Sequence, residues 1–123
     1  MHGPSVLIIH SINHWVTVTN IYYINNIPYF SKHEWNLYDS LNLPCYEMDA
    51  TKTLRRISPY FTLSRVSCNL QAGSSDCGLF AIGFAIALCE GINPASLKFN
   101  QDRMRKHYDN CINKCLFSQF PLI

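Results

Sequence analysis

Four residues in this chain carry the groups that a thiol hydrolase needs, namely His14, Asp39, Gln71 and Cys77. Such an enzyme attacks with a thiolate, moves protons through a base held by a third group, and binds the resulting oxyanion with N–H donors. Cys77 follows the polar segment 71–76 and precedes the apolar segment 78–89, which predicts a position in the first turn of a buried helix. Unpaired backbone N–H groups and the helix dipole stabilise negative charge there. The pattern therefore predicts Cys77 as the nucleophile, with its own N–H as one oxyanion donor.

The other three residues stand where strands or loops are expected to begin or end. His14 starts an alternating segment and is the predicted base, and Asp39 follows a short strand pattern and is predicted to orient the imidazole. Gln71 offers a neutral amide six residues before Cys77 as a second oxyanion donor, a contribution of about 3 kcal/mol where such donors have been tested. Each residue alone more often has a structural role. Their occurrence together, in the order His, Asp, Gln, Cys, favours catalysis.

Length and composition indicate one folded domain over residues 1–123. The chain is 48% hydrophobic and 15% charged, with a formal net charge of +2, which is typical of a globular protein with a core. Segment 98–114 holds five basic residues against two acidic ones. This density favours the solvated face of a helix over a nucleic-acid site, so no nucleic-acid partner is expected. The longest apolar run, Gly78 to Cys89, is too short to span a membrane.

The six cysteines are scattered and mostly lie among apolar residues, as small buried hydrophobic side chains would. They form no Cys-x-x-Cys pair, and the segment Met1-His2-Gly3-Pro4 lacks the charge of a secretory leader. We therefore expect a reducing compartment, either the nucleus or the cytoplasm, and no metal or other cofactor. A zinc site built from His10, His14 and the cysteines is the least favoured alternative.

Hydrophobic periodicity predicts an α+β fold, in which a small mixed or antiparallel sheet packs on a central buried helix that carries Cys77. Strands are expected at 6–9, 14–24, 34–38 and 60–70, the first two forming a hairpin, with a turn or insertion at 25–28. A helix is expected at 49–57, capped by Asp49 or Thr51 and stopped at Ser58-Pro59. A second helix, capped by Ser74 or Ser75, is expected to carry Cys77 in its first turn and to end at Cys89 before Gly91, and a third is expected at 100–115. The last helix has an apolar stripe of Met104, Tyr108, Cys111, Ile112 and Cys115.

Three segments of the chain resemble the motifs of the Ulp1-like cysteine proteases, the peptidases that remove SUMO and NEDD8 from their conjugates. These segments are His14-Trp15, Tyr38-Asp39-Ser40-Leu41, and Gln71-Ala72-Gly73-Ser74-Ser75-Asp76-Cys77-Gly78-Leu79-Phe80, in the family's order and with similar spacing. The downstream segments Gly91-Ile92-Asn93-Pro94, Asp102-Arg103-Met104-Arg105 and Phe120-Pro121 are similar to copies in transposon-related reading frames of animals. The resemblance covers essentially the whole chain.

The resemblance implies a papain-like or adenain-like fold and a cysteine-type peptidase or isopeptidase. By it, His14, Asp39 and Cys77 would form the triad, and Gln71 would hold the oxyanion. Trp15 would form one wall of the narrow channel for the Gly-Gly tail of a ubiquitin-like modifier, which is the implied partner. Cleavage after Gly-Gly would proceed through a thioester.

In one respect the chain departs from the family pattern. Family domains carry a further N-terminal segment that supplies the opposing channel wall and much of the surface that grips the modifier. We therefore expect a partial or degenerate copy with weak isolated activity, in which the edge strand Val6 to Ile9 is left partly unpaired. Two alternatives stay open: a non-catalytic, transposon-derived module that at most binds a ubiquitin-like modifier, and an acyltransferase that uses the same triad.

Overall fold

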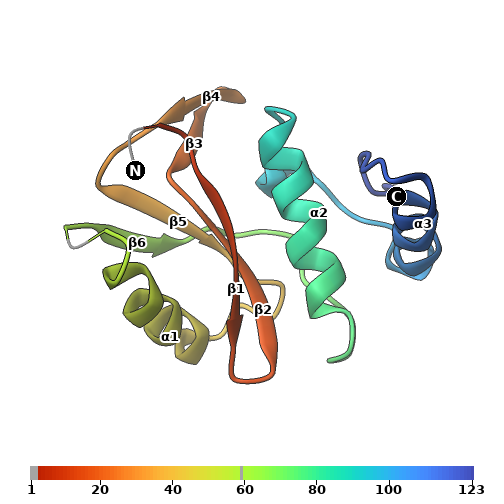
Figure 1. Ribbon diagram of the computed structural model, residues 1–123, viewed down its shortest axis with the longest axis horizontal. Coiled ribbons are helices and arrows are strands. Elements are labelled where there is room, and N and C mark those ends of the chain that lie inside the picture. The colour runs from red at the N-terminus through yellow and green to blue at the C-terminus, as the bar shows by residue number, and fades with distance from the viewer. Residues whose placement is uncertain (1–2, 59) are drawn as a thin grey trace.

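The computed structural model, which describes residues 3–58 and 60–123, has a mixed four-stranded sheet between helices (Figure 1). The strand order is β1-β2-β5-β6, with β1 (Val6–Ser11), β2 (His14–Thr19), β5 (Glu34–Tyr38) and β6 (Thr62–Arg65). Strand β2 runs antiparallel to both of its neighbours, β1 and β5, whereas β6 runs parallel to β5. Helix α1 (Pro44–Arg55) covers one face, and α2 (Cys77–Cys89) covers the other (Figure 1). The expected α+β class and mixed sheet are confirmed.

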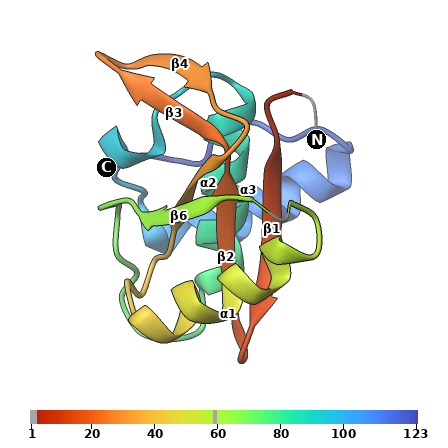
Figure 2. The same cartoon turned by 90° about the vertical axis from the view of Figure 1, so that its left-hand side faces the viewer.

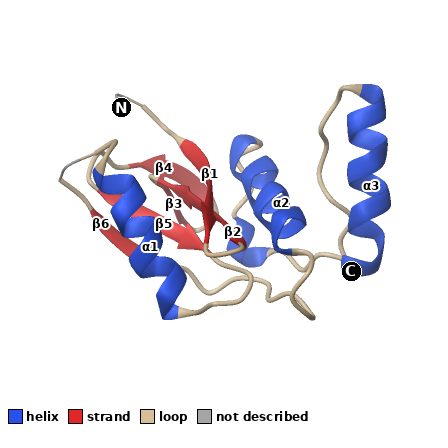
Figure 3. Ribbon diagram, turned by 60° about the horizontal axis from the view of Figure 1, so that its bottom comes forward, coloured by secondary structure: helices blue, strands red, loops and turns tan. Residues whose placement is uncertain are grey.

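Two further helical elements complete the described chain. Helix α3 (Gln101–Lys114) lies outside α2, so the layers run from α1 through the sheet and α2 to α3 (Figure 3). A short 3₁₀ turn, η1 (Pro94–Ser96), precedes α3. No helix in the described ranges is long and apolar enough to cross a membrane.

The hairpin β1–β2 sets the position of His14. Its two turn residues, Ile12 and Asn13, have φ values of 46° and 60°, as a tight type I′ connection requires. Ser11 pairs with His14 in register, so the histidine is the first residue of β2 after the turn. The predicted hairpin is therefore confirmed, with β1 at the edge of the sheet.

Strand β2 alternates its side chains between the two helical layers. Val16 and Val18 pack with Ala50 and Leu54 of α1, and His14 has the same parity along the strand. On the opposite face, the Thr17 hydroxyl donates a hydrogen bond of 2.7 Å to the carbonyl of Ala81 in α2. This bond fixes α2 against the strand that carries the histidine.

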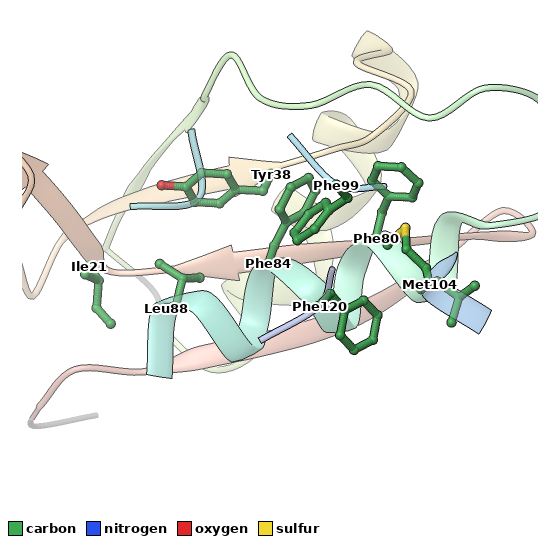
Figure 4. Close-up of a cluster of buried hydrophobic side chains, with 9 residues drawn as sticks. Ile21, Tyr38, Phe80, Phe84, Leu88, Phe99, Met104 and Phe120 are labelled. Carbon is green, nitrogen blue, oxygen red and sulfur yellow. The ribbon is translucent and has the colours of Figure 1, made fainter. Parts of the chain in front are cut away.

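Helix α2 is buried because its sequence is apolar on nearly every side. Phe80 and Phe84 meet Tyr38 of β5 and the downstream residues Phe99 and Phe120 in one aromatic cluster (Figure 4). Gly91 lies just beyond the C-cap residue Glu90 with φ of +74°, which confirms the expected glycine stop. Asp76 is the N-cap residue of α2, so the prediction that Ser74 or Ser75 caps this helix is wrong.

Several element boundaries differ from the sequence predictions. The segment 14–24 is not one strand, because the chain leaves the sheet at Asn20 and forms a separate hairpin of β3 (Ile21–Ile24) and β4 (Ile27–Phe30), which stands above the sheet in Figure 2. Strand β6 is much shorter than the expected 60–70. Helix α1 begins at Pro44 rather than at position 49, which excludes Asp49 and Thr51 as its caps. Pro59, the expected stop, lies outside the described residues.

The cysteines and the last helix correct two further expectations. All six cysteines are free, but only Cys77 and Cys111 are buried, so the prediction of mostly buried thiols is wrong. In α3, the apolar stripe is buried at Met104 and Cys111, whereas Ile112 and Cys115 are exposed. The stripe therefore faces the core only in part.

Gly83 provides a stability test of the α2 packing. A Cβ atom at this position would lie 3.0 Å from Phe99 Cζ and 3.3 Å from Phe120 Cδ2, and both rings are buried. We expect Gly83→Ala to destabilise the fold by about 1–2 kcal/mol, because overpacking outweighs the gain of about 1 kcal/mol in helix propensity. Urea unfolding measures the change.

Gly78→Ala in the same helix is the matched control, because its Cβ would meet only Trp15 Cδ1 at 3.6 Å. We expect this variant to be neutral or slightly stabilising. Equal stabilisation of the protein by both substitutions would contradict the described packing around Gly83.

Candidate active site

The structure joins His14 and Asp39 in a buried pair. His14 Nε2 lies 2.6 Å from Asp39 Oδ1, and the two residues are 1% and 2% exposed. Asp39 Oδ1 also accepts a hydrogen bond of 2.9 Å from the Leu41 N–H, and Oδ2 accepts one of 3.0 Å from the Leu43 N–H. Because an ionised carboxylate only accepts, His14 donates from Nε2. In the neutral imidazole, this arrangement leaves Nδ1 without a proton and able to act as a base.

The sheet register explains why these two residues meet. Thr17 pairs with Tyr38 across the antiparallel strands β2 and β5. Asp39, which follows β5, therefore lies at the same end of the sheet as the start of β2. Asn42, with φ of 52°, then folds the chain back, and its N–H donates to the Asp39 carbonyl at 3.0 Å. The turn after β5 therefore brings two backbone N–H groups to the carboxylate.

Tyr46 of α1 covers the imidazole. Its ring centroid lies 4.1 Å from that of His14, at an interplanar angle of 40°. Burial raises the pKa of Tyr46, and negative charge on Cys45, Asp39 and Cys77 raises it further. Helix α1 therefore supplies the aromatic ring that packs against the His14 imidazole.

Cys77 is the first residue of α2, as predicted, and is 7% exposed. Within the described ranges, its thiol makes no hydrogen bond with the His14 ring, so the structure does not join the predicted nucleophile directly to the predicted base. Catalytic hydrogen bonds are often long in enzymes without substrate and tighten in the complex. The Thr17–Ala81 bond, one helical turn from the cysteine, holds the two elements at a fixed offset.

Cys77 opens into a surface pocket of about 380 Å³. The half-exposed Trp15 lines this pocket beside Gly78, and its ring packs against His10 with a centroid distance of 4.6 Å and an interplanar angle of 47°. The other lining residues are Asn13, Ser74, Ser75, Leu79, Ile82, Arg105 and Tyr108. The structure therefore places the predicted wall residue Trp15 on the same pocket as the predicted nucleophile.

Gln71 is buried and is held by three hydrogen bonds. Its N–H donates to the Ser40 carbonyl at 2.9 Å, its Oε1 accepts from the Ser40 hydroxyl, and its Nε2 donates to the Gly73 carbonyl at 3.0 Å. The pocket lining does not include Gln71. An amide nitrogen carries two hydrogens, so one N–H of Nε2 has no partner among the described residues.

Helix α3 secures the loop between Gln71 and Cys77. The Gln101 side chain accepts from the Ala72 N–H at 2.8 Å and donates to the Ala72 carbonyl at 2.8 Å and to Asp76 at 2.9 Å. Arg105 Nη2 donates to the other Asp76 oxygen at 2.8 Å. Both ends of the loop are thereby tied to one helix.

The sequence predictions did not include Ser40, Tyr46, Gln101 or Arg105 as site residues. Ser40 follows Asp39 in the segment Tyr38-Asp39-Ser40-Leu41, so its place beside the predicted triad residue could have identified it as a site residue. The other three reach the site only through the packing of α1 and α3, and no local pattern identifies them.

Other titratable groups near the site have structural roles. Cys68 lies beneath Asp39, with its thiol donating to the Asp39 carbonyl at 3.7 Å. Burial raises the pKa of Cys68 to about 12, so this thiol stays protonated near neutral pH. The described residues contain no group of three or more histidine, cysteine or acidic side chains placed to hold a metal ion.

Comparison with models of protein families found no match, and comparison with curated proteins found none either.

Asp39→Asn tests the role of the carboxylate in the fold. The asparagine side chain has an NH₂ group in place of one carboxylate oxygen. This group would face at least one of the three hydrogen-bond donors that now bind Asp39, which come from His14, Leu41 and Leu43. We expect a loss of about 2–3 kcal/mol in unfolding free energy, because a buried donor loses a charged acceptor. Urea denaturation measures this loss.

Asp109→Asn on the exposed side of α3 is the control, and it should change stability by less than about 0.5 kcal/mol. Equal stability of the two variants would show that the three bonds to Asp39 contribute nothing.

Proposed function

We propose that the chain is a cysteine peptidase domain of the Ulp1-like type with a papain-like or adenain-like fold. The observation that carries this proposal is the buried His14–Asp39 pair, with Nδ1 of the imidazole free, beside a helix that begins at Cys77. A carboxylate, an imidazole and a thiol in this order are the parts of a cysteine-hydrolase triad.

In the proposed reaction, Cys77 attacks the scissile carbonyl carbon, and its thiol proton passes to His14 Nδ1. The C–N bond breaks as His14 returns that proton to the leaving amine, which leaves a thioester on Cys77. Water then attacks the thioester carbonyl and gives one proton to His14. The C–S bond breaks, the carboxylic acid leaves, and His14 returns its proton to the sulfur. Asp39 stabilises the imidazolium in both steps.

The oxyanion would be stabilised by two donors of different origin. One is the Cys77 backbone N–H at the unpaired start of α2. The other is the second N–H of Gln71 Nε2, whose first N–H is engaged by the Gly73 carbonyl. Donors that are already oriented need no rearrangement in the transition state.

The proposed substrate is a ubiquitin-like modifier, or its conjugate, cleaved after Gly-Gly in the nucleus or cytoplasm. Trp15 supports this proposal, because its ring lies against the start of α2 at Gly78, where a side chain on the substrate would compete with it. A second candidate, a module that binds a modifier without turnover, is favoured by the absence of a bond between the Cys77 thiol and His14 within the described residues.

Covalent labelling tests the function. Ubiquitin-like modifiers with a C-terminal glycine vinyl sulfone are incubated with the protein, and adducts are resolved by mass spectrometry. We expect an adduct on Cys77 that is lost in Cys77→Ala and reduced at least about tenfold in His14→Ala.

Cys45→Ala, which removes an exposed thiol from α1, is the matched control and should label like the wild type. Labelling of the wild type no stronger than that of Cys77→Ala would overturn the peptidase proposal. Tight binding of a modifier without an adduct would favour the binding module.

A further inference from the structure

Ser40 and Gln71 contact each other through both backbone and side chain. The Gln71 N–H donates to the Ser40 carbonyl at 2.9 Å, and the Ser40 hydroxyl is bonded to Gln71 Oε1. Both residues are buried, and they are 31 positions apart in the sequence. Ser40 therefore holds Gln71 at two points.

The orientation of the Gln71 amide follows from its second partner. The Gly73 carbonyl lies 3.0 Å from the other end of the amide and can only accept a hydrogen bond. The amide nitrogen must therefore face Gly73, which leaves the oxygen facing Ser40. Since an amide oxygen carries no hydrogen, the Ser40 hydroxyl is the donor. The Gly73 contact therefore selects the amide orientation, and the Ser40 contact holds the oxygen end of the amide in place.

Amide orientation decides whether Gln71 helps or hinders a reaction that forms an oxyanion. The nitrogen end stabilises developing negative charge, whereas the oxygen end repels it. A glutamine that loses the donor to its oxygen also regains side-chain freedom, and a small misplacement of a catalytic group can lower the rate greatly.

We propose that Ser40 is a positioning residue that fixes Gln71 as an oxyanion donor. The inference rests on the proposed peptidase function. Asp39 and Ser40, consecutive residues after β5, then serve two parts of the chemistry, since Asp39 orients the base and Ser40 orients the donor. Loss of the Ser40 hydroxyl should impair the acyl reaction and spare the reactivity of the thiol itself.

Two reactions of Cys77 separate these effects. Hydrolysis of a modifier that carries a C-terminal fluorogenic amide passes through an oxyanion. Alkylation by chloroacetamide does not, because sulfur displaces chloride at a saturated carbon. For Ser40→Ala we expect kcat to fall at least about tenfold, a part of the 10²–10³ lost when a donor is removed. KM and the alkylation rate constant should each stay within about twofold, since the contact acts in the transition state.

Ser11→Ala is the matched control. Ser11 is also buried, and its hydroxyl has no hydrogen-bond partner among the residues that the structure describes. The same chemical change at Ser11 should leave kcat within about twofold of the wild type, a limit set by the small effect expected when no bond is lost. A comparable fall in both variants would assign the effect to general packing and overturn the inference.

A double-mutant cycle with Gln71→Ala completes the test. If Ser40 acts through Gln71, the double variant should be no slower than Gln71→Ala alone. Additive losses, or a parallel fall in alkylation of Ser40→Ala, would overturn the positioning role. Absence of Cys77-dependent turnover in the wild type would overturn the inference together with the proposed function. Turnover that Ser40→Ala leaves intact would overturn the inference alone.

Discussion

The structure depends most on the buried contact between His14 and Asp39. A carboxylate out of water is stable only when donors bind its oxygens, and removing one partner of a buried ion pair typically costs about 3–5 kcal/mol. The fold meets this requirement with backbone groups, since the chain after β5 turns back and offers the N–H groups of Leu41 and Leu43 to the carboxylate. The tight β1–β2 turn then places His14 at the start of β2, at the end of the sheet where β5 ends.

The remaining parts of the site are held to this edge by separate devices. Thr17 bonds the strand of His14 to the helix of Cys77. Gln101 and Arg105 hold the loop before Cys77 from the outer helix, and Ser40 holds Gln71 from the inner side. His14, Asp39 and Cys77 each stand at the end of a strand or helix whose own core packing is apolar, and Gln71 stands in the loop before α2. Polar side chains at these positions form the site while the apolar core between the sheet and the helices stays closed to water.

The sequence was sufficient for features that rest on local pattern. Alternation predicted the β1–β2 hairpin, and the change from a polar loop to an apolar run placed Cys77 at a helix start. Local pattern predicted the wrong boundaries where two neighbouring strands are built from the same kinds of residues. The apolar and β-branched residues continue through Asn20, so two strands in different sheets were predicted as one. The first helix was predicted to start at position 49, although proline suits the first turn of a helix, where Pro44 stands in α1.

The contacts that shape the site had no such signal. The bonds of Gln101 to Ala72 and of Ser40 to Gln71 join residues about thirty positions apart, and they form only after the helices have packed. The packing of the Tyr46 ring against His14 likewise depends on the position of α1 across one face of the sheet. Burial of individual cysteines was also unpredictable, because an apolar neighbour in sequence does not place a thiol on the inner side of its element.

We propose that His14 activates Cys77, and one measurement tests this role directly. The most direct measurement is the alkylation rate constant of Cys77 at pH 6, where a free thiol is only about 0.3% thiolate. The account predicts alkylation at least about tenfold faster than that of a free cysteine peptide, as expected for a thiol beside a histidine at a helix start. His14→Ala should remove the advantage, and His33→Ala, at an exposed histidine, should keep it. A wild-type rate equal to that of the free peptide, or one unaffected by His14→Ala, would contradict the account.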